Sequence, residues 1–372
     1  MDCRRPSGDF EMKTFNLAIL SGDGIGPEIM AEAQTILEYL KQTGLVDFQI
    51  QEALVGGASI RDSGSPITNA TLDMVKTADA ILFGAVGDYS FDHLPQSERP
   101  EVAILKLRKE LELFANIRPI VIFDELIENS NLKKEVLQNV DFVIVRELTG
   151  DIYFGEPRGE KKIDGVRHGF NTMTYSEPEI ERIANVGFKL AEARRRKVTS
   201  VDKANVLETM QLWRDVVSRV SESYKDIELQ HMYVDNAAMQ LINLPAQFDV
   251  IVTGNIFGDI LSDQASMITG SIGLLPSASL NEGLLGLYEP IHGSAPDIAG
   301  KNKANPLAMM LSTAMMFRHS LDKSDIADLI EQAVKNTLGK RIATPDFCRE
   351  GWRKISTNDM GREVLKELSK LC

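Results

Sequence analysis

The chain has 372 residues, a formal net charge of −13 and a mean hydropathy of −0.13. At about 100–200 residues per domain, this length predicts two domains. The excess of 54 Asp and Glu over 41 Lys and Arg argues against nucleic acid and anionic membrane surfaces as partners. No apolar run approaches the roughly 18–20 residues of a membrane helix, so we expect no membrane partner.

The two ends of the chain carry little structural signal. Residues 1–12 carry three acidic residues and lack an apolar centre, unlike a secretory signal, and we expect a disordered leader. Three cysteines, Cys3, Cys348 and Cys372, form no C-x-x-C pair. Their odd number and terminal positions favour the reducing cytoplasm, without a disulfide framework or a zinc site.

Short apolar runs alternate with turns and helix-periodic segments. The first run, 15–20, ends at a glycine turn, and helical periodicity then continues to Leu40. Four later runs have the same strand character: 80–83, 142–145, 198–201 and 250–253. Repeated strand–helix units predict an α/β fold with a largely parallel sheet.

Two glycine-containing loops are candidates for nucleotide binding. The first, 22–27, has Pro27 where the Rossmann fingerprint has its third glycine, so a Rossmann fold is not predicted. The second, 289–300, combines small residues with Asp297, a possible acceptor for ribose hydroxyls. A purely structural turn is the alternative for this loop.

Two segments of the central region interrupt the strand–helix pattern. Between Leu148 and Thr174, glycine and aromatic residues replace helical periodicity, which predicts a protruding hairpin or arm. The dense basic run at 194–197 is expected to close an amphipathic helix as a solvated end, where cations favour the negative end of the helix dipole. We prefer this to a nucleic-acid patch.

The helix expected after Pro100 has two distinct faces. An ordinary core stripe is formed by Ala103, Leu107, Leu111 and Phe114. The second face carries Glu101, Ile104, Leu105 and Arg108. Charge, two branched aliphatic residues and charge suit a small ligand with one apolar branch and one carboxylate; helix-packing contacts with solvated ends are the alternative.

Arginines recur where anionic ligands bind in α/β proteins. Arg146 ends a very apolar run, and Arg118 lies in the preceding segment. A buried guanidinium needs an anionic partner. With Arg108, these residues could hold a dicarboxylate through bidentate contacts; structural salt bridges are the alternative for each.

Acidic residues suggest a metal centre. Asp259 and Asp263 are four residues apart and share one helix face, and hard oxygen ligands without His or Cys favour Mg²⁺ or Mn²⁺. A solvated acidic face is the alternative. Lys203 and Asp235 each follow an apolar strand end, where a lysine can act as a base or form a structural ion pair.

Eight segments, taken in order, resemble one family, the β-decarboxylating dehydrogenases of the isocitrate/isopropylmalate type. The resemblance extends from about residue 15 to the C-terminus. The segments are GDGIGPE, RPEVAILKLRKELELFANIRP, VIVRELTG, IYFGEPRG, VDKANVLE, YVDNAAMQL, TGNIFGDILSD and EPIHGSAPDIAG.

The resemblance implies a two-domain α/β fold of the isopropylmalate dehydrogenase type, with a mixed, largely parallel sheet flanked by helices. Residues 13–113 and 270–372 would form a discontinuous nucleotide-binding domain. Residues 114–269 would form a central domain for substrate, metal and dimerisation, with the arm near 148–174. A cytoplasmic homodimer with shared active sites is expected.

Site residues follow from the same resemblance. Tyr153 and Lys203 would transfer protons. The substrate would be bound by Glu101, Ile104, Leu105, Arg108, Arg118, Arg146, Asp235 and the partner's Val206. Mg²⁺ or Mn²⁺ would be held by Asp235, Asp259 and Asp263, with Lys203 and Asp235 reaching the neighbouring subunit. NAD would contact Ile25, Gly84, Glu289, His292, Gly293, Ser294, Ala295, Asp297, Ile298 and Asn305.

The expected reaction is oxidative decarboxylation of 3-isopropylmalate to 4-methyl-2-oxopentanoate with reduction of NAD, a step of leucine biosynthesis. Isocitrate, homoisocitrate and tartrate are alternative substrates. A metal-dependent lyase without redox chemistry and a catalytically silent dicarboxylate-binding protein are alternatives outside the class. The sequence departs from the family pattern at Ser21, 88–91, Asp151 and Lys303.

Overall fold

The computed structural model describes residues 13–130 and 132–372, so the expected leader lies outside the described residues. The chain divides into two compact units. Among the described residues, unit 1 comprises 13–113, 123–130 and 269–372, and unit 2 comprises 114–122 and 132–268. The segment 123–130, which we expected in the central domain, therefore belongs to unit 1.

Unit 1 contains five sheet strands in the order β2-β1-β3-β12-β11, of which only β11 runs antiparallel to its neighbour β12. The strands are β1 (Thr14–Gly22), β2 (Asp47–Glu52), β3 (Ala80–Ala85), β11 (Pro276–Leu280) and β12 (Gly286–Pro290), with a small separate pair, β13 (Ile342–Ala343) and β14 (Arg353–Lys354). The helices are α1 (Gly26–Gln42), α2 (Gly56–Ser63), α3 (Asn69–Lys76), α4 (Val102–Glu110), α10 (Leu307–His319), α11 (Ser324–Leu338) and α12 (Thr357–Leu371).

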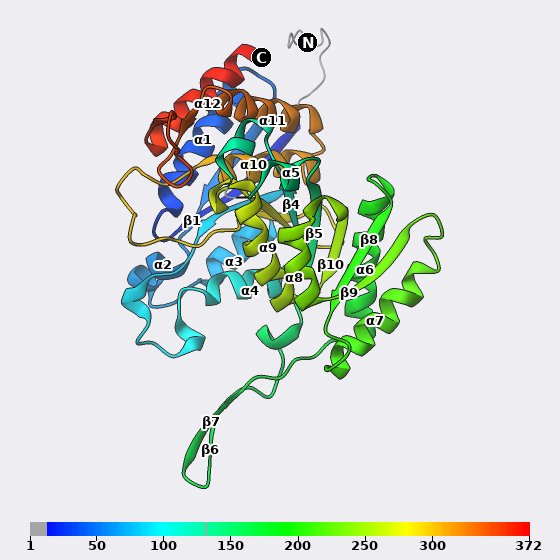
Figure 1. Ribbon diagram of the computed structural model, residues 1–372. Coiled ribbons are helices and arrows are strands. Elements are labelled where there is room, and N and C mark those ends of the chain that lie inside the picture. Colours follow the sequence, from blue (N-terminus) through cyan, green and yellow to red (C-terminus); the bar gives the residue numbers. More distant parts are fainter. Residues whose placement is uncertain (1–12, 131) are drawn as a thin grey trace. The chain divides into compact units, whose positions relative to one another are not determined.

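Helices cover both faces of the unit 1 strands. Ala18 and Leu20 of β1 pack in one apolar cluster with buried residues of α3 and α4. On the other face α1 contacts β1 and β3, while α10 contacts β12 and packs against α11 (Figure 1). Alternation along β1 thus buries both of its faces, as expected for a largely parallel sheet.

Unit 2 contains the strands in the order β4-β5-β10-β8-β9, of which only β4 is antiparallel. They are β4 (Ala115–Val121), β5 (Asp141–Glu147), β8 (Lys197–Asp202), β9 (Glu228–Tyr233) and β10 (Val250–Thr253). The helices are α5 (Lys134–Leu137), α6 (Glu177–Glu192), α7 (Glu208–Ser221), α8 (Val234–Asn243) and α9 (Asn255–Thr269). The expected mixed, largely parallel α/β architecture is confirmed.

The helix α6 illustrates how local sequence builds unit 2. It begins with a capping box in which Ser176 and Glu179 satisfy each other's backbone N–H groups. It then packs on β5, β8 and β10. Gly187 makes this close approach possible, because a Cβ there would lie 2.1 Å from Cγ2 of Val252.

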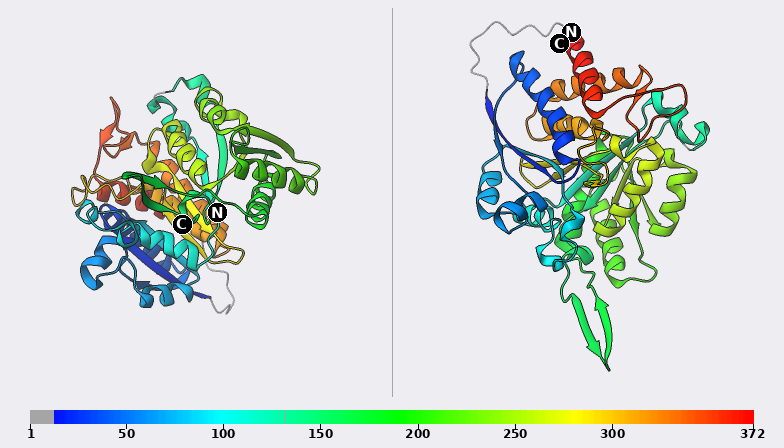
Figure 2. Two further views of the ribbon diagram at one scale, coloured as in Figure 1. Left: turned by 90° about the horizontal axis from the view of Figure 1, so that it is seen from below. Right: turned by 90° about the vertical axis from the view of Figure 1, so that its left-hand side faces the viewer.

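The predicted hairpin between Leu148 and Thr174 is confirmed. Strands β6 (Gly159–Ile163) and β7 (Val166–Phe170) pair antiparallel, and nearly all of their residues are exposed. Figures 1 and 2 show this hairpin extending from the rest of unit 2.

The prediction for the basic run is confirmed in part, since Arg195 and Arg196 are exposed just beyond the end of α6. The helix α6 ends at Glu192, before the run begins. Arg194 pairs with Asp249 at 2.9 Å and with Asp141 at 2.7 Å, and Arg195 donates to the carbonyl of Phe248. Arg194 is therefore half-buried in ion pairs with Asp141 and Asp249, which the prediction did not include.

No helix among residues 13–130 and 132–372 is long and apolar enough to cross a membrane. Within the same residues, Cys348 and Cys372 form no disulfide.

Candidate active site

Unit 2 brings two of the predicted arginines together at neighbouring strands. Arg118 on β4 and Arg146 on β5 are both almost fully buried. In the β4–β5 register, Arg146 lies opposite Asn116, and Asn116 accepts a hydrogen bond from Arg118 Nε at 2.5 Å. Strand pairing therefore positions two buried guanidinium groups beside each other.

Asp259 on α9 is the anionic partner of both arginines. Its Oδ1 accepts from Arg146 Nη1 and, at 3.5 Å, from Arg118 Nη1. Its Oδ2 accepts from the Tyr153 hydroxyl at 3.0 Å. One carboxylate thus joins three predicted site residues that come from different parts of the chain.

Asp263 lies one helical turn beyond Asp259. Its Oδ1 is 4.0 Å from Arg118 Nη1, and the side chain is 57 % exposed. Partial burial and the charge of Asp259 raise the pKa of Asp263, although the two arginine charges oppose this change. A divalent cation would relieve the repulsion between the carboxylates, so this pair fits a hard metal ion.

The remaining predicted ligand, Asp235, has a different neighbour. Its Oδ2 lies 3.1 Å from Lys203 Nζ, and this hydrogen bond lowers the pKa of Asp235. Among the described residues of this single chain, no three His, Cys, Asp or Glu side chains form a group able to hold a metal. Asp259 and Asp263 therefore form one pair, whereas Asp235 pairs with Lys203. Val206, three residues after Lys203, is 64 % exposed.

The predicted ligand face of α4 lies in unit 1. Arg108 Nη2 donates to Glu289 Oε1 of β12 at 3.0 Å, and both side chains are about nine-tenths buried. Ile104 is part of the apolar cluster and Leu105 is half-buried. Ile104 therefore packs within the unit 1 core, as the helix-packing alternative proposed, while Glu101 immediately precedes the helix.

The end of α4 also differs from our prediction. The helix ends at Glu110, and Glu112 adopts a left-handed backbone with φ of +52°. Phe114 consequently falls outside the helical stripe, although it is buried. The residue leads into β4 instead.

The candidate nucleotide loop is tied to the first glycine turn. Ile25 N donates to the carbonyl of Ser294 at 2.8 Å, and Ser294 Oγ donates to the carbonyl of Gly87 at 2.7 Å. A Cβ on Gly24 would lie 2.0 Å from the Ser294 carbonyl oxygen. Gly84 is held equally closely, since its Cβ would lie 2.2 Å from the carbonyl oxygen of Ser21.

Two features of this loop fit a polar ligand. His292 Nδ1 lies 2.9 Å from the carbonyl oxygen of Gly293, while its buried Nε2 has no hydrogen-bond partner. Burial lowers the pKa of His292. A Cβ on Gly293 would meet no atom within 4 Å, so the loop leaves open space beside its backbone.

Other predicted cofactor residues have local structural roles. Ala295 and Ile298 form a turn through a backbone hydrogen bond of 3.1 Å, and the carbonyl of exposed Asp297 accepts from Lys301. Asn305 is buried, donates to Asp346 at 3.1 Å and accepts from Leu307 N at 3.1 Å. Both polar groups of Asn305 are thus engaged within unit 1.

The unusual residues 88–91 form an ordered turn. Asp88 accepts from Ser90 N at 2.9 Å and from Arg61 Nη1 at 2.6 Å. The Arg61 guanidinium also lies over the ring of Phe91 at 5.5 Å. These contacts give residues 88–91, which depart from the family pattern, a defined structure.

Several residues that organise the site escaped sequence reasoning. Asn255 accepts from Arg146 Nε at 3.0 Å, and Ser262 accepts from Arg118. In unit 1, buried Asp23 accepts from the backbone N–H groups of Gly57, Ala58 and Gly87. Asp23 and Asn255 carry one sequence signal, a polar side chain just after a strand end, whereas Ser262 lies within α9 and carries none.

Comparisons with known proteins match this architecture. Residues 16–364 match the model of the isocitrate/isopropylmalate dehydrogenase family. A 3-isopropylmalate dehydrogenase from Nitrosomonas europaea is 56% identical over 352 residues, covering 95% of this chain and 99% of the relative. One from Burkholderia lata is 57% identical over 357 residues, with the same coverage.

Solved structures give the same result. Isocitrate dehydrogenase from Methylococcus capsulatus has a TM-score of 0.85 and 33% identity, covering 95% of this chain and 99% of its own. A beta-decarboxylating dehydrogenase from Thermococcus kodakarensis has a TM-score of 0.77 and 33% identity, covering 96% and 97%. The chain therefore belongs to the isocitrate/isopropylmalate dehydrogenase family.

Proposed function

We propose that this enzyme oxidises and decarboxylates 3-isopropylmalate to 4-methyl-2-oxopentanoate and CO₂ while reducing NAD. The observation that carries the proposal is the cluster of Arg118, Arg146 and Tyr153 on Asp259, which combines anion-binding, proton-transfer and metal-ligating groups. Relatives named 3-isopropylmalate dehydrogenase at 56–57% identity support this substrate.

The arginines would bind the substrate carboxylates. Arg118 and Arg146 are buried, and both guanidinium groups pair with Asp259. Arg108 of unit 1 would contribute a third guanidinium, at present paired with Glu289. Planar guanidinium groups bind carboxylates bidentately, which fixes the orientation of a dicarboxylate.

The donor set fits a divalent cation of the Mg²⁺ or Mn²⁺ type. Asp259 and Asp263 would hold it with Asp235 from a second copy of the chain, because Asp235 does not join the other two acids within one chain. When bound, such an ion supplies Lewis-acid polarisation of the substrate oxygens.

Two side chains of unit 2 would move protons. Lys203 Nζ would accept the proton of the C2 hydroxyl as hydride passes from C2 to the nicotinamide. The resulting β-keto acid then loses CO₂, and Tyr153 Oη would return a proton to the carbon that lost it. The Asp259 carboxylate holds this hydroxyl at 3.0 Å.

The loop 289–300 fits a dinucleotide. The unpaired Nε2 of His292 offers a polar contact, and the open space at Gly293 admits a ligand close to the backbone. Asp297 would accept the ribose hydroxyls and repel a 2′-phosphate, which favours NAD over NADP. A kcat/KM that is equal for the two cofactors would contradict this assignment.

A homodimer with shared active sites is also part of the proposal. The helix α8, which begins beside Asp235, exposes Met239 and Ile242. Exposed apolar side chains grouped on one helix are typical of subunit interfaces. The cytoplasmic location expected from the cysteine pattern belongs to the same proposal.

Isocitrate is the second candidate substrate, because the Methylococcus capsulatus structure with a TM-score of 0.85 is an isocitrate dehydrogenase. A third carboxylate requires a polar or cationic partner. On the predicted ligand face of α4, Ile104 packs into the unit 1 core, and the half-buried side chain of Leu105 is apolar. Neither offers such a partner, so we favour the isopropyl substrate.

The test is NADH formation by the purified enzyme with Mg²⁺. We expect kcat/KM for 3-isopropylmalate to exceed that for isocitrate by about 100-fold or more, the scale of a mispaired buried charge. Equal values would overturn the substrate assignment. Absence of NADH with either substrate would favour a lyase or a silent binding protein, since neither reduces NAD.

A further inference from the structure

Asp151 is a buried acid at a backbone position that favours glycine. It is the first residue of the short helical turn η4 (Asp151–Tyr153), its φ is +70°, and its side chain is completely buried. Left-handed backbone costs a residue with a Cβ about 1 kcal/mol, although Asp tolerates it better than most. Its side chain must therefore contribute contacts that a glycine cannot make.

The carboxylate of Asp151 joins two backbone segments. Oδ1 accepts from Ile152 N at 2.7 Å inside η4, and Oδ2 accepts from Ile256 N at 3.1 Å. Ile256 is the second residue of α9. Gly254, the residue that precedes the helix, has no side chain that could cap it. Asp151 supplies the missing acceptor from another part of the chain, and its negative charge suits a helix N-terminus.

The backbone of Asp151 fixes the same turn from the other side. Its N–H donates to the carbonyl of Thr174 at 3.0 Å, and its carbonyl accepts from Gly155 N at 2.9 Å. Tyr175, next to Thr174, also receives a hydrogen bond at its hydroxyl from Asn255 N, at 2.9 Å. Asn255 Nδ2 also donates to the carbonyl of Gly150, the residue before η4, at 3.3 Å. The turn and the start of α9 are thus joined by hydrogen bonds of the Asp151, Tyr175 and Asn255 side chains.

Both ends of this connection carry proposed site residues. Tyr153 ends η4, and its hydroxyl donates to Asp259 in the next turn of α9 at 3.0 Å. The distance between the Tyr153 hydroxyl and Asp259 therefore depends on where η4 sits along α9. The Asp151 side chain sets that position together with the Tyr175 hydroxyl and the Asn255 side chain.

We propose that Asp151 is a positioning residue for Tyr153, because its carboxylate joins η4 to the first turn of α9 and so holds the Tyr153 hydroxyl on Asp259. This inference rests on the proposed function, in which Tyr153 returns a proton to the substrate carbon.

The first test needs no substrate. Asp151→Gly keeps the left-handed backbone but removes both side-chain hydrogen bonds. Hydrogen–deuterium exchange of the full chain should become about 10-fold faster in peptides that contain Ile152 and Ile256. The matched control is Asp322→Gly, which makes the same change at an exposed residue of unit 1 with φ of +52°. Unchanged exchange at Ile256 would overturn the proposal.

The second test is kinetic. Asp151→Gly should lower kcat about 10-fold or more with little change in the KM for 3-isopropylmalate, because the arginines are untouched. Asp151→Asn keeps one acceptor oxygen and should fall between wild type and Asp151→Gly. A larger KM with unchanged kcat would contradict the role, and Asp322→Gly should match wild type.

A double variant separates positioning from a general structural effect. If Asp151 acts through the Tyr153 hydroxyl, Asp151→Gly should cause no further loss of kcat, within about 2-fold, in a Tyr153→Phe background. Losses that multiply would overturn the proposal. If wild type does not oxidise 3-isopropylmalate, the proposed function fails; the exchange test still applies, and the kinetic comparison uses the dicarboxylate that is oxidised.

Discussion

At the scale of single residues, Asp259 has the most demanding position. It accepts hydrogen bonds from Arg118, Arg146 and Tyr153, and it is a proposed metal ligand. In the structure, Asp259 is therefore an acid partner of both arginines. When a metal ion and a dicarboxylate bind, Asp259 would pair with the metal ion, and Arg118 and Arg146 would pair with the substrate carboxylates.

Asp259→Asn should reduce kcat/KM at limiting Mg²⁺ by about 100-fold or more, because an amide binds a hard cation less strongly than a carboxylate does. A titration of NADH formation against Mg²⁺ measures this effect. The matched control is Asp226→Asn, at an exposed loop residue after α7. Activity equal to wild type at limiting Mg²⁺ would contradict the metal assignment.

A second residue-scale prediction concerns pH. Glu32 of α1 is 7% exposed and lies against Gly361 of α12. Burial raises the pKa of Glu32 to about 7, although the charge of Arg362 opposes the change. Because the folded-state pKa of Glu32 is raised, the folded protein favours the protonated carboxyl group. Its contribution to the unfolding free energy is complete below pH 4.5, the ordinary pKa, and is lost as the pH rises through 7.

At pH 8 the unfolding free energy of Glu32→Gln should therefore exceed that of wild type by about 1–3 kcal/mol. Chemical denaturation measures this as a higher midpoint concentration of denaturant. The difference should shrink towards pH 5. Glu38→Gln, at an exposed position of the same helix, is the control. A pH-independent difference between Glu32→Gln and wild type would contradict the role of this carboxyl group.

At the scale of elements, helix–strand contacts determine where the site residues lie. The helix α6 packs on β10, whose C-terminal end leads through Gly254 into α9. Gly187 permits this contact. A change in the distance between α6 and β10 would therefore shift the start of α9, the helix that carries Asp259.

Gly187→Ala should lower the unfolding free energy by about 1–3 kcal/mol, because the added methyl group overlaps Val252. Chemical denaturation measures the change. Gly339→Ala is a suitable comparison, because its Cβ would meet only ordinary contacts of 3.5 Å or more. Equal stability of the two variants would show that α6 moves without cost.

At the scale of the whole molecule, the separation of Asp235 from Asp259 and Asp263 within one chain is the feature that favours a dimer. Met239 of α8 is 62% exposed, and Met239→Glu would place a charge on the proposed interface. We expect monomers in sedimentation velocity and loss of NADH formation. Leu284→Glu, at a 75% exposed residue of unit 1, should remain dimeric and active. A fully active monomer would refute shared sites.

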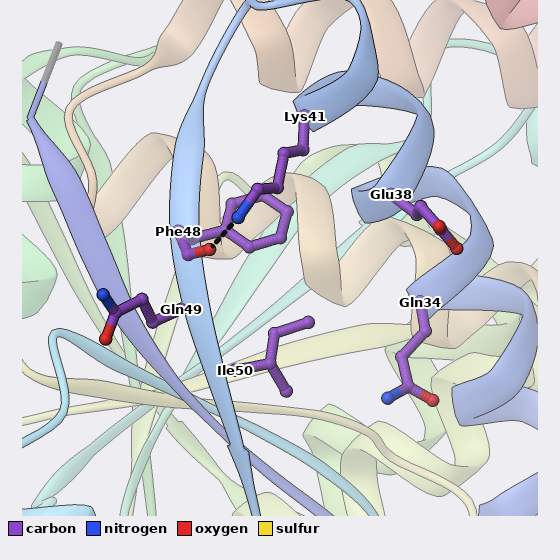
Figure 3. A pocket seen from close by; sticks show the side chains of 6 residues that line it. All are labelled: Gln34, Glu38, Lys41, Phe48, Gln49 and Ile50. Carbon is purple, nitrogen blue, oxygen red and sulfur yellow. Dashed lines mark hydrogen bonds between the residues drawn. The ribbon is translucent and has the colours of Figure 1, made fainter.

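One surface pocket of unit 1 lies outside the predicted site. Figure 3 shows a pocket of unit 1 lined by α1 and β2, with Lys41 donating to the carbonyl of Phe48 at 2.7 Å. None of its lining residues belongs to the predicted site. This pocket, with a volume of about 470 Å³, is therefore separate from the proposed active site.

The sequence by itself determined the class of the fold and the chemical types at the site. Apolar runs such as 250–253 match the observed strand β10, because side-chain alternation and turn residues act over a few neighbours. The spacing of Asp259 and Asp263 placed both on one helix face for the same local reason. The family resemblance then assigned roles that local patterns left open.

Only the tertiary structure decided which groups meet. Arg146 and Tyr153 reach Asp259 across 113 and 106 residues, and no local pattern encodes such a choice of partner. The same holds for the burial of Ile104 and for Asp151, whose carboxylate caps α9 from 105 residues away. Long-range packing sets these contacts, because the free energy of burial depends on what the folded chain brings alongside each side chain.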